Sequence, residues 1–111
     1  MSLDALFSEL TEANEVLGDI EDRLIISSAC SLIQPYHIKL DQLREQSANL
    51  TKIGTTGRGI GTSYEDKVGR RSVRISDLYD ERKLNDKLTQ ALDFYNSIFE
   101  YSFGTSKIDL N

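Results

Sequence analysis

The chain has 111 residues, 39% of them hydrophobic and 28% charged, and its formal net charge at pH 7 is -5. This is the composition of a soluble globular protein of at most one domain. Its acidic balance argues against nonspecific nucleic-acid binding, and its apolar runs are too short to cross a membrane. The N-terminus lacks the pattern of a signal peptide, which favours a cytoplasmic location. With one cysteine, Cys30, and one histidine, an intrachain disulfide and a Cys/His zinc site are excluded.

The first predicted element is an amphipathic helix over residues 4–17. Its apolar residues recur at helical spacing, and Gly18 follows where a helix C-cap is expected. Leu24-Ile25-Ile26 then predicts a short buried strand near residues 24–27. Because no partner strand is evident, we expect residues 1–28 to belong to the edge of an α/β domain whose sheet lies outside this sequence.

Residues 29–111 are predicted to be mainly helical. Pro35 suits the first turn of a helix that runs to about residue 48. His37 lies in that turn, and a lone histidine there is expected to be a structural hydrogen-bonding group rather than a catalyst. Ser63 is expected to cap a short helix that ends near Arg71.

The longest predicted helix covers about residues 81–101. Aromatic residues recur along it and just beyond it, which favours a role in the core or in a subunit interface; they are Phe94, Tyr95, Phe99, Tyr101 and Phe103. Gly104 is expected to end this helix, and the tail to residue 111 is expected to be frayed.

The most unusual stretch is residues 52–74, KIGTTGRGIGTSYEDKVGRRSVR, which holds five of the seven glycines and six of the thirteen Lys and Arg. Glycines let a backbone approach a ligand closely, and threonine hydroxyls and arginine forks bind phosphate or carboxylate oxygens. The glycines are not followed by GK[ST], so this is not a Walker loop. Two interpretations stand at this point, an anion site and a flexible surface loop.

The residues themselves resemble a known family. Gly54-Thr55-Thr56-Gly57-Arg58-Gly59-Ile60-Gly61, followed by Tyr64-Glu65-Asp66-Lys67 and Arg70-Arg71, is similar to a signature stretch of the adenylosuccinate synthetases. The similarity continues in order over about residues 4–96. It implies a small helical subdomain of orthogonal helices plus a glycine-rich loop, residues 53–63, normally inserted in a larger α/β enzyme. We expect residues 54–63 of that loop to be mobile in the absence of ligand.

The resemblance implies a reaction as well. Enzymes of this family are homodimeric ligases of AMP biosynthesis that join IMP to L-aspartate while hydrolysing GTP, with Mg²⁺, by way of a 6-phosphoryl intermediate. Their catalytic base, acid histidine, guanine-recognition motif and aspartate-binding loop match nothing in these 111 residues. We therefore expect no catalytic residue, bound GTP or Mg²⁺ here, and we expect the chain alone to be inactive.

Site residues follow from the resemblance position by position. Thr56 corresponds to a threonine that contacts the 5'-phosphate of IMP, and Arg70 to an arginine that reaches this phosphate from the neighbouring subunit. The candidate active-site neighbours are Thr55, Gly57, Arg58 and Lys67. The family usually has proline where this chain has Thr62, a change expected to loosen the exit of the loop.

A different class of function is also open at this level. The chain could be a noncatalytic helical module that binds an anion or a partner protein. Assay of a full-length protein with GTP, IMP and L-aspartate separates the two classes.

Overall fold

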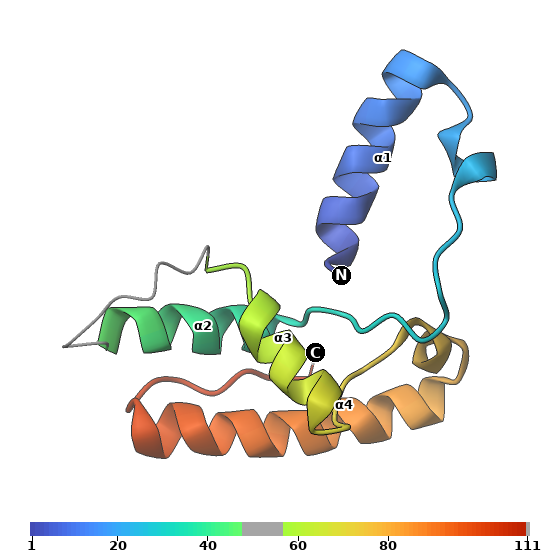
Figure 1. Cartoon of the computed structure of the whole chain (residues 1–111). Coiled ribbons are helices and arrows are strands. Elements are labelled where there is room, and N and C mark those ends of the chain that lie inside the picture. Colours follow the sequence, from blue (N-terminus) through green and yellow to red (C-terminus); the bar gives the residue numbers. More distant parts are fainter. Residues whose placement is uncertain (48–56, 111) are drawn as a thin grey trace.

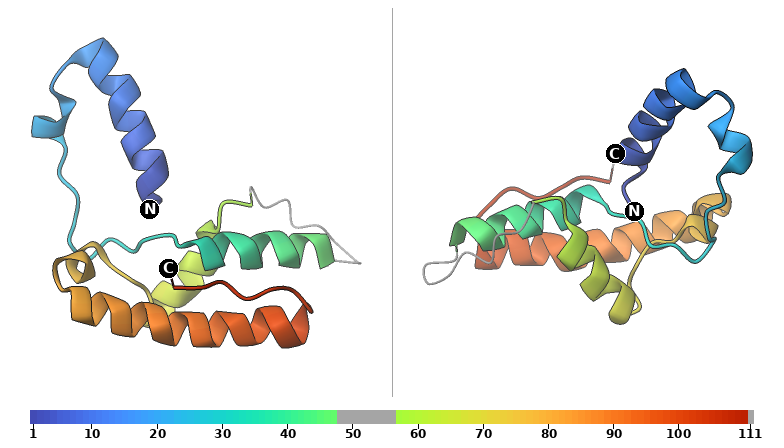
Figure 2. Two further views of the ribbon diagram at one scale, coloured as in Figure 1. Left: turned by 180° about the vertical axis from the view of Figure 1, so that it is seen from behind. Right: turned by 45° about the horizontal axis from the view of Figure 1, so that its top comes forward.

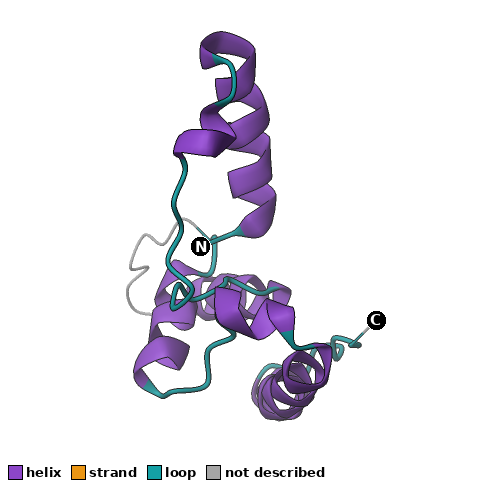
Figure 3. Ribbon diagram, turned by 90° about the vertical axis from the view of Figure 1, so that its right-hand side faces the viewer, coloured by secondary structure: helices purple, strands orange, loops and turns teal. Residues whose placement is uncertain are grey.

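A computed structural model describes residues 1–47 and 57–110 (Figure 1). In chain order its longer helices are α1 (Leu3–Leu17), α2 (Pro35–Ser47), α3 (Ile60–Val68) and α4 (Glu81–Ser97). Short 3-10 turns, Ile20–Arg23 and Ile75–Tyr79, precede α2 and α4, and a π-helical turn, Ile98–Ser102, continues α4. The described part is mainly helical and has no strand, which confirms a small helical subdomain (Figure 3).

Helix α1 projects away from the other helices in every view (Figures 1 and 2). It begins at the side chain of Ser2, which accepts the Ala5 N–H, and it ends at Gly18, whose φ of 63° is the left-handed conformation that glycine favours. None of its residues is buried. Its apolar residues are therefore only partly covered by the described part of the chain: Leu6 and Leu10 are half-buried, whereas Phe7 and Val16 are exposed.

The predicted buried strand near residues 24–27 is wrong. This segment is extended, but it joins no strand among the described residues, and Ile25 is 94% exposed. Apolar β-branched residues favour an extended backbone, but they are buried in a strand only when a second strand supplies the ladder. The nearest pairing is a single antiparallel bridge further on, between Ser31 and Arg74.

The core lies between α2 and α4, which run side by side (Figures 1 and 2). Its buried members are Tyr36, Leu40, Ala91, Leu92, Tyr95 and Phe99. The Tyr36 and Tyr95 rings stack with their centroids 4.6 Å apart. The 3.6-residue spacing that predicted these two helices is therefore the spacing of the residues that meet in the core.

Helix α4 starts where Asp80 accepts the Lys83 N–H, at 3.1 Å. Its last turn widens into the π-helix, inside which Phe99 is fully buried. Gly104 then ends the helical run with a φ of 60°. The predicted helix over about 81–101 is thus confirmed, with a change of helical type near its end.

The tail after Gly104 packs against α4, so the expectation that it is frayed is wrong up to residue 110. The Asn96 side chain pairs with the Ile108 backbone in both directions, at 2.7 and 2.9 Å. Ile108 also packs on the core. The Asn96 amide both donates to the Ile108 carbonyl and accepts the Ile108 N–H, and this pair of hydrogen bonds holds the tail against α4.

Candidate functional site

Helix α3 begins at Ile60, three residues before the predicted cap. Gly59 is its N-cap, with a φ of 76°, and Ser63 lies inside the helix, where its N–H donates to the Gly59 carbonyl at 3.0 Å. The prediction that Ser63 caps this helix is therefore wrong. Glycine forms no side-chain cap hydrogen bond, whereas serine is a common N-cap residue that does, so the sequence pattern favoured Ser63 as the cap.

Gly59 also lies directly against α2. A Cβ atom at this position would come within 2.8 Å of the Ile38 nitrogen and 2.9 Å of the His37 carbonyl carbon. The Gly59 N–H donates to the Asp41 carboxylate at 3.2 Å. Both the close approach and the left-handed φ require glycine here.

The end of the glycine-rich loop is fastened to the same helix at two more points. Gln42 Nε2 donates to the Gly57 carbonyl at 3.4 Å, and the buried hydroxyl of Thr62 lies 2.9 Å from the His37 carbonyl and 3.0 Å from that of Gly59. The side chain that stands where the family usually has proline thus ties α3 to α2, and the looser loop exit expected from this change stays a prediction. The mobility expected of residues 54–63 stays a prediction, since residues 48–56 lie outside the described part.

A buried carboxylate lies further along α3. Asp66 Oδ2 is 2.7 Å from Nε2 of His37, and neither side chain is exposed to solvent. His37 Nδ1 accepts the Gln34 N–H at 2.9 Å, so Nε2 carries the proton and donates to Asp66. This geometry fits the structural hydrogen-bonding role predicted for His37.

The environment of Asp66 favours its charged form. Burial raises the pKa of a carboxyl group, but the hydrogen bonds from His37 and Tyr95 and the positive charge of Arg71 outweigh burial and hold the pKa of Asp66 below its usual value. An ionised carboxylate without solvent needs such partners. Asp66 therefore joins α2, α3 and α4 at one point.

Arg71 folds back onto this carboxylate. Its Nε lies 3.2 Å from Asp66 Oδ1, and its guanidinium stacks over the Phe94 ring, 4.6 Å from the centroid. A Cβ atom on Gly69 would lie 3.0 Å from Arg71 Nη1. Glycine at position 69 therefore leaves room for the returning guanidinium.

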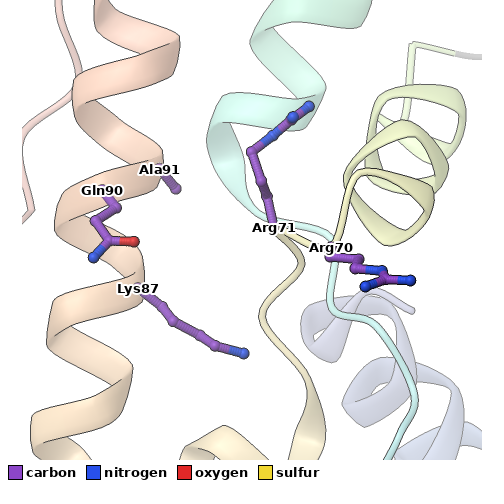
Figure 4. A pocket seen from close by; sticks show the side chains of 5 residues that line it. All are labelled: Arg70, Arg71, Lys87, Gln90 and Ala91. Atoms are coloured by element: carbon purple, nitrogen blue, oxygen red, sulfur yellow. The ribbon is translucent and has the colours of Figure 1, made fainter.

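Arg70 differs from Arg71 in its contacts and in its backbone conformation. Its side chain is exposed and forms no ion pair with any described residue, and its φ is 61°, the left-handed conformation. Figure 4 shows the two arginine side chains pointing apart at the rim of a pocket of about 150 Å³. Arg70, Arg71, Lys87, Gln90 and Ala91 line this pocket.

The predicted site residues divide into three groups. Thr55 and Thr56 lie outside the described residues. Gly57 and Arg58 come just before α3, and Lys67 and Arg70 lie at its far end, where the Lys67 carbonyl accepts the Arg70 N–H at 3.2 Å. Lys67 and Arg70 nevertheless line different pockets, since Lys67 lines a hollow of about 260 Å³ together with residues that include Cys30, Ser31 and Tyr64. The structure therefore brings their backbones together but not their side chains.

Sequence reasoning missed the structural parts played by Thr62, Asp66 and Arg71. The motif contained all three, but their partners His37 and Phe94 lie more than 20 residues away. No local spacing predicts such pairs.

No three His, Cys, Asp or Glu side chains of the described residues gather in a way that could hold a metal ion. The same part of the chain contains no helix long and apolar enough to span a bilayer.

Comparison with known proteins identifies the family. The family model described as adenylosuccinate synthetase matches residues 1–111. The chain is 52% identical to the adenylosuccinate synthetase of Acidithiobacillus ferrooxidans over 99 residues, 89% of this chain and 23% of the relative. It is 49% identical to adenylosuccinate synthetase 1 of Burkholderia lata over 109 residues, 98% of this chain and 24% of the relative. The chain thus spans about a quarter of the length of these curated relatives, and it belongs to the adenylosuccinate synthetase family.

Proposed function

We propose that these 111 residues form part of the IMP-phosphate site of an adenylosuccinate synthetase. The full-length protein would be a cytoplasmic ligase that joins IMP and L-aspartate, with hydrolysis of GTP, in AMP biosynthesis. Family membership supports the reaction. The observation that carries the role of this stretch is the conformation of Arg70, an exposed arginine held at a φ of 61° beside a second arginine that is fully engaged.

Phosphate binding suits the residues on either side of α3. A guanidinium stays charged at all physiological pH values and binds phosphate oxygens through two parallel N–H donors, which is the task proposed for Arg70. Thr56 would donate its hydroxyl and backbone N–H to the same 5'-phosphate. Thr55, Gly57, Arg58 and Lys67 are proposed as neighbours of this site.

We propose that Arg70 acts in a homodimer, on the phosphate bound by the partner subunit. Its exposure and its direction, away from Arg71 and the core, support a contact with another chain (Figure 4). A ligand held by two chains links binding to association, so IMP should tighten the dimer.

Magnesium and GTP belong to the proposed full-length reaction. The described residues contain no cluster of three His, Cys, Asp or Glu side chains that could hold a metal ion, and we derive no step through Mg²⁺. The chain's own part is to bind and orient the phosphate of IMP. Because positioning supplies no rate without reacting groups to position, the 111-residue chain alone is expected to release no phosphate from GTP in the presence of IMP and L-aspartate.

Kinetics of the full-length protein test this proposal. Thr56→Ala removes one hydrogen bond to a charged group, worth about 1.5–3 kcal/mol, so the KM for IMP should rise roughly ten- to a hundredfold. The KM for GTP should hardly change. Equal rises in both values would show damage to the fold. A full-length protein without any activity on these substrates would instead favour the noncatalytic anion-binding or protein-interaction module.

A further inference from the structure

We propose that Asp66 is a positioning residue for substrate binding, which holds Arg70 in its phosphate-binding direction by fixing Arg71. This inference rests on the proposed function of Arg70. Asp66 itself is fully buried, so the proposal gives it no direct contact with substrate. Its effect passes through the turn that follows α3.

The backbone of this turn is tied to the end of α3. The Arg70 N–H donates to the Lys67 carbonyl at 3.2 Å, and the Arg71 N–H donates to the Asp66 carbonyl at 2.8 Å. This pair of bonds is the Schellman arrangement, in which the residue after the C-cap adopts the left-handed conformation. Gly69 is the C-cap, so the left-handed position falls on Arg70.

Glycine is the usual residue at that position, because a Cβ atom makes the left-handed conformation unfavourable. A strained conformation persists only where the surroundings impose it, and such strain gathers at functional sites. The surroundings here include a second fastening, since the Asp66 carboxylate holds the Arg71 side chain as its carbonyl holds the Arg71 backbone. One residue therefore grips Arg71 at two points.

The grip on Arg71 decides where Arg70 points. The Arg71 guanidinium contacts the Asp66 carboxylate and the Phe94 ring. The absence of a side chain at Gly69 leaves room for it to do so. With Arg71 turned toward α4 and the intervening backbone fixed, the Arg70 side chain leaves on the other side (Figure 4). Asp66 is in turn held by His37 from α2. Loss of its charge should let Arg71 swing out and leave Arg70 free to sample other directions.

The test uses the full-length enzyme that contains this stretch. Asp66→Asn keeps the size of the side chain and removes its charge, and we expect the KM for IMP to rise roughly tenfold, as for loss of one well-placed charged contact. The KM values for GTP and L-aspartate should stay unchanged. In an Arg70→Leu background, Asp66→Asn should raise the KM for IMP no further, because both changes remove the same contact.

Two further variants distinguish the positioning role from damage to the fold: one should leave the KM for IMP unchanged, and the other should raise it. Asp77→Asn alters a second buried, ion-paired carboxylate, which forms no ion pair with Arg70 or Arg71, and should leave the KM for IMP unchanged. Arg71→Met removes the partner of Asp66 at a half-exposed side chain and should reproduce the rise. Arg71→Met also tests the positioning role of Asp66 if the Asp66→Asn variant does not fold.

The outcomes separate the two proposals. If Arg70→Leu raises the KM for IMP while folded Asp66→Asn or Arg71→Met leaves it unchanged, the positioning role is wrong and the proposed function stands. If Arg70→Leu itself has no effect, the proposed role of Arg70 fails. An equal rise in Asp77→Asn, or additive effects of Asp66→Asn and Arg70→Leu, would also overturn the positioning role.

Discussion

The backbone carbonyl and the side chain of His37 hold Thr62 and Asp66, respectively, with His37 Nε2 2.7 Å from Asp66 Oδ2. One residue of α2 thereby fixes both halves of α3. The glycine-rich loop leads into the first half, and Arg70 follows the second. The orientation of α3 on α2 therefore sets where Arg70 leaves the end of α3.

The buried His37–Asp66 pair should contribute far more to stability than an exposed pair of equal length. His37→Ala leaves the Asp66 charge buried with one partner fewer, so the free energy of unfolding of the chain should fall by about 3–5 kcal/mol. Arg44→Ala breaks an ion pair that also joins α2 to α3 at 2.7 Å, but both side chains are about half exposed. Its cost should be below about 1 kcal/mol. Urea unfolding of the two variants measures the difference, and similar losses would contradict it.

Gly59, which lies directly against α2, should tolerate substitution far less well than Gly61. Gly59→Ala places a methyl group 2.8 Å from the Ile38 nitrogen at a φ of 76°, and it should destabilise the chain by at least about 2 kcal/mol. Gly61→Ala lies in the first turn of α3 with nothing within 4 Å, so it should be neutral or stabilise by about 0.5 kcal/mol. Thermal unfolding of the pair checks both, and a reversed order would refute the close approach.

The left-handed backbone conformation of Arg70 should lower the free energy of unfolding of the chain, although its side chain is proposed to bind phosphate. Arg70→Gly removes the Cβ atom from a left-handed position and should raise the free energy of unfolding by about 1 kcal/mol. In the full-length enzyme the same change should weaken binding of IMP. Arg70→Ala keeps a Cβ atom and should weaken binding without the gain in stability. A destabilised Arg70→Gly variant would show that the side chain has a structural role.

Acid should weaken the fold through Asp77. Burial opposes its ionisation, but Lys87, the Arg74 N–H and Lys83 outweigh burial and lower its pKa from 3.8 to about 2. Since the folded pKa is the lower one, the stabilisation is complete above the unfolded value and is lost as the pH falls through the folded one. Ionised Asp77 therefore contributes about 2 kcal/mol to the free energy of unfolding, and this contribution is lost as the pH falls from roughly 5 to 2. Asp77→Asn should show a shallower fall in stability over this range, and an unchanged slope would contradict the assignment.

Local patterns predicted the elements whose causes are local. The starts of α2 and α4 and the end of α1 follow from Pro35, Asp80 and Gly18, which act within one turn of the chain. The strand near 24–27 was wrong because a strand needs a partner, which no local pattern supplies. The start of α3 was misplaced because its cap is a glycine held from outside by α2.

The candidate site was less accessible to sequence reasoning than the fold. Composition indicated an anion site in residues 52–74, but the roles of Thr56 and Arg70 came from the family resemblance alone. The contacts around Asp66 join residues far apart in the sequence, and the left-handed conformation of Arg70 depends on the bonds of a turn. Tertiary structure alone distinguishes the engaged Arg71 from the exposed Arg70.

Mixing two full-length variants that both have little activity at an IMP concentration far below the raised KM of Arg70→Leu tests most directly whether this stretch completes the IMP site of a partner subunit. One variant carries Arg70→Leu, and the other lacks the catalytic base, which we expect to lie outside these residues. If Arg70 acts on the partner's phosphate, a mixed dimer contains one site with both groups intact, and the mixture should regain part of the activity that neither variant shows. No recovery, with exchange of subunits confirmed, would mean that Arg70 does not reach across the dimer.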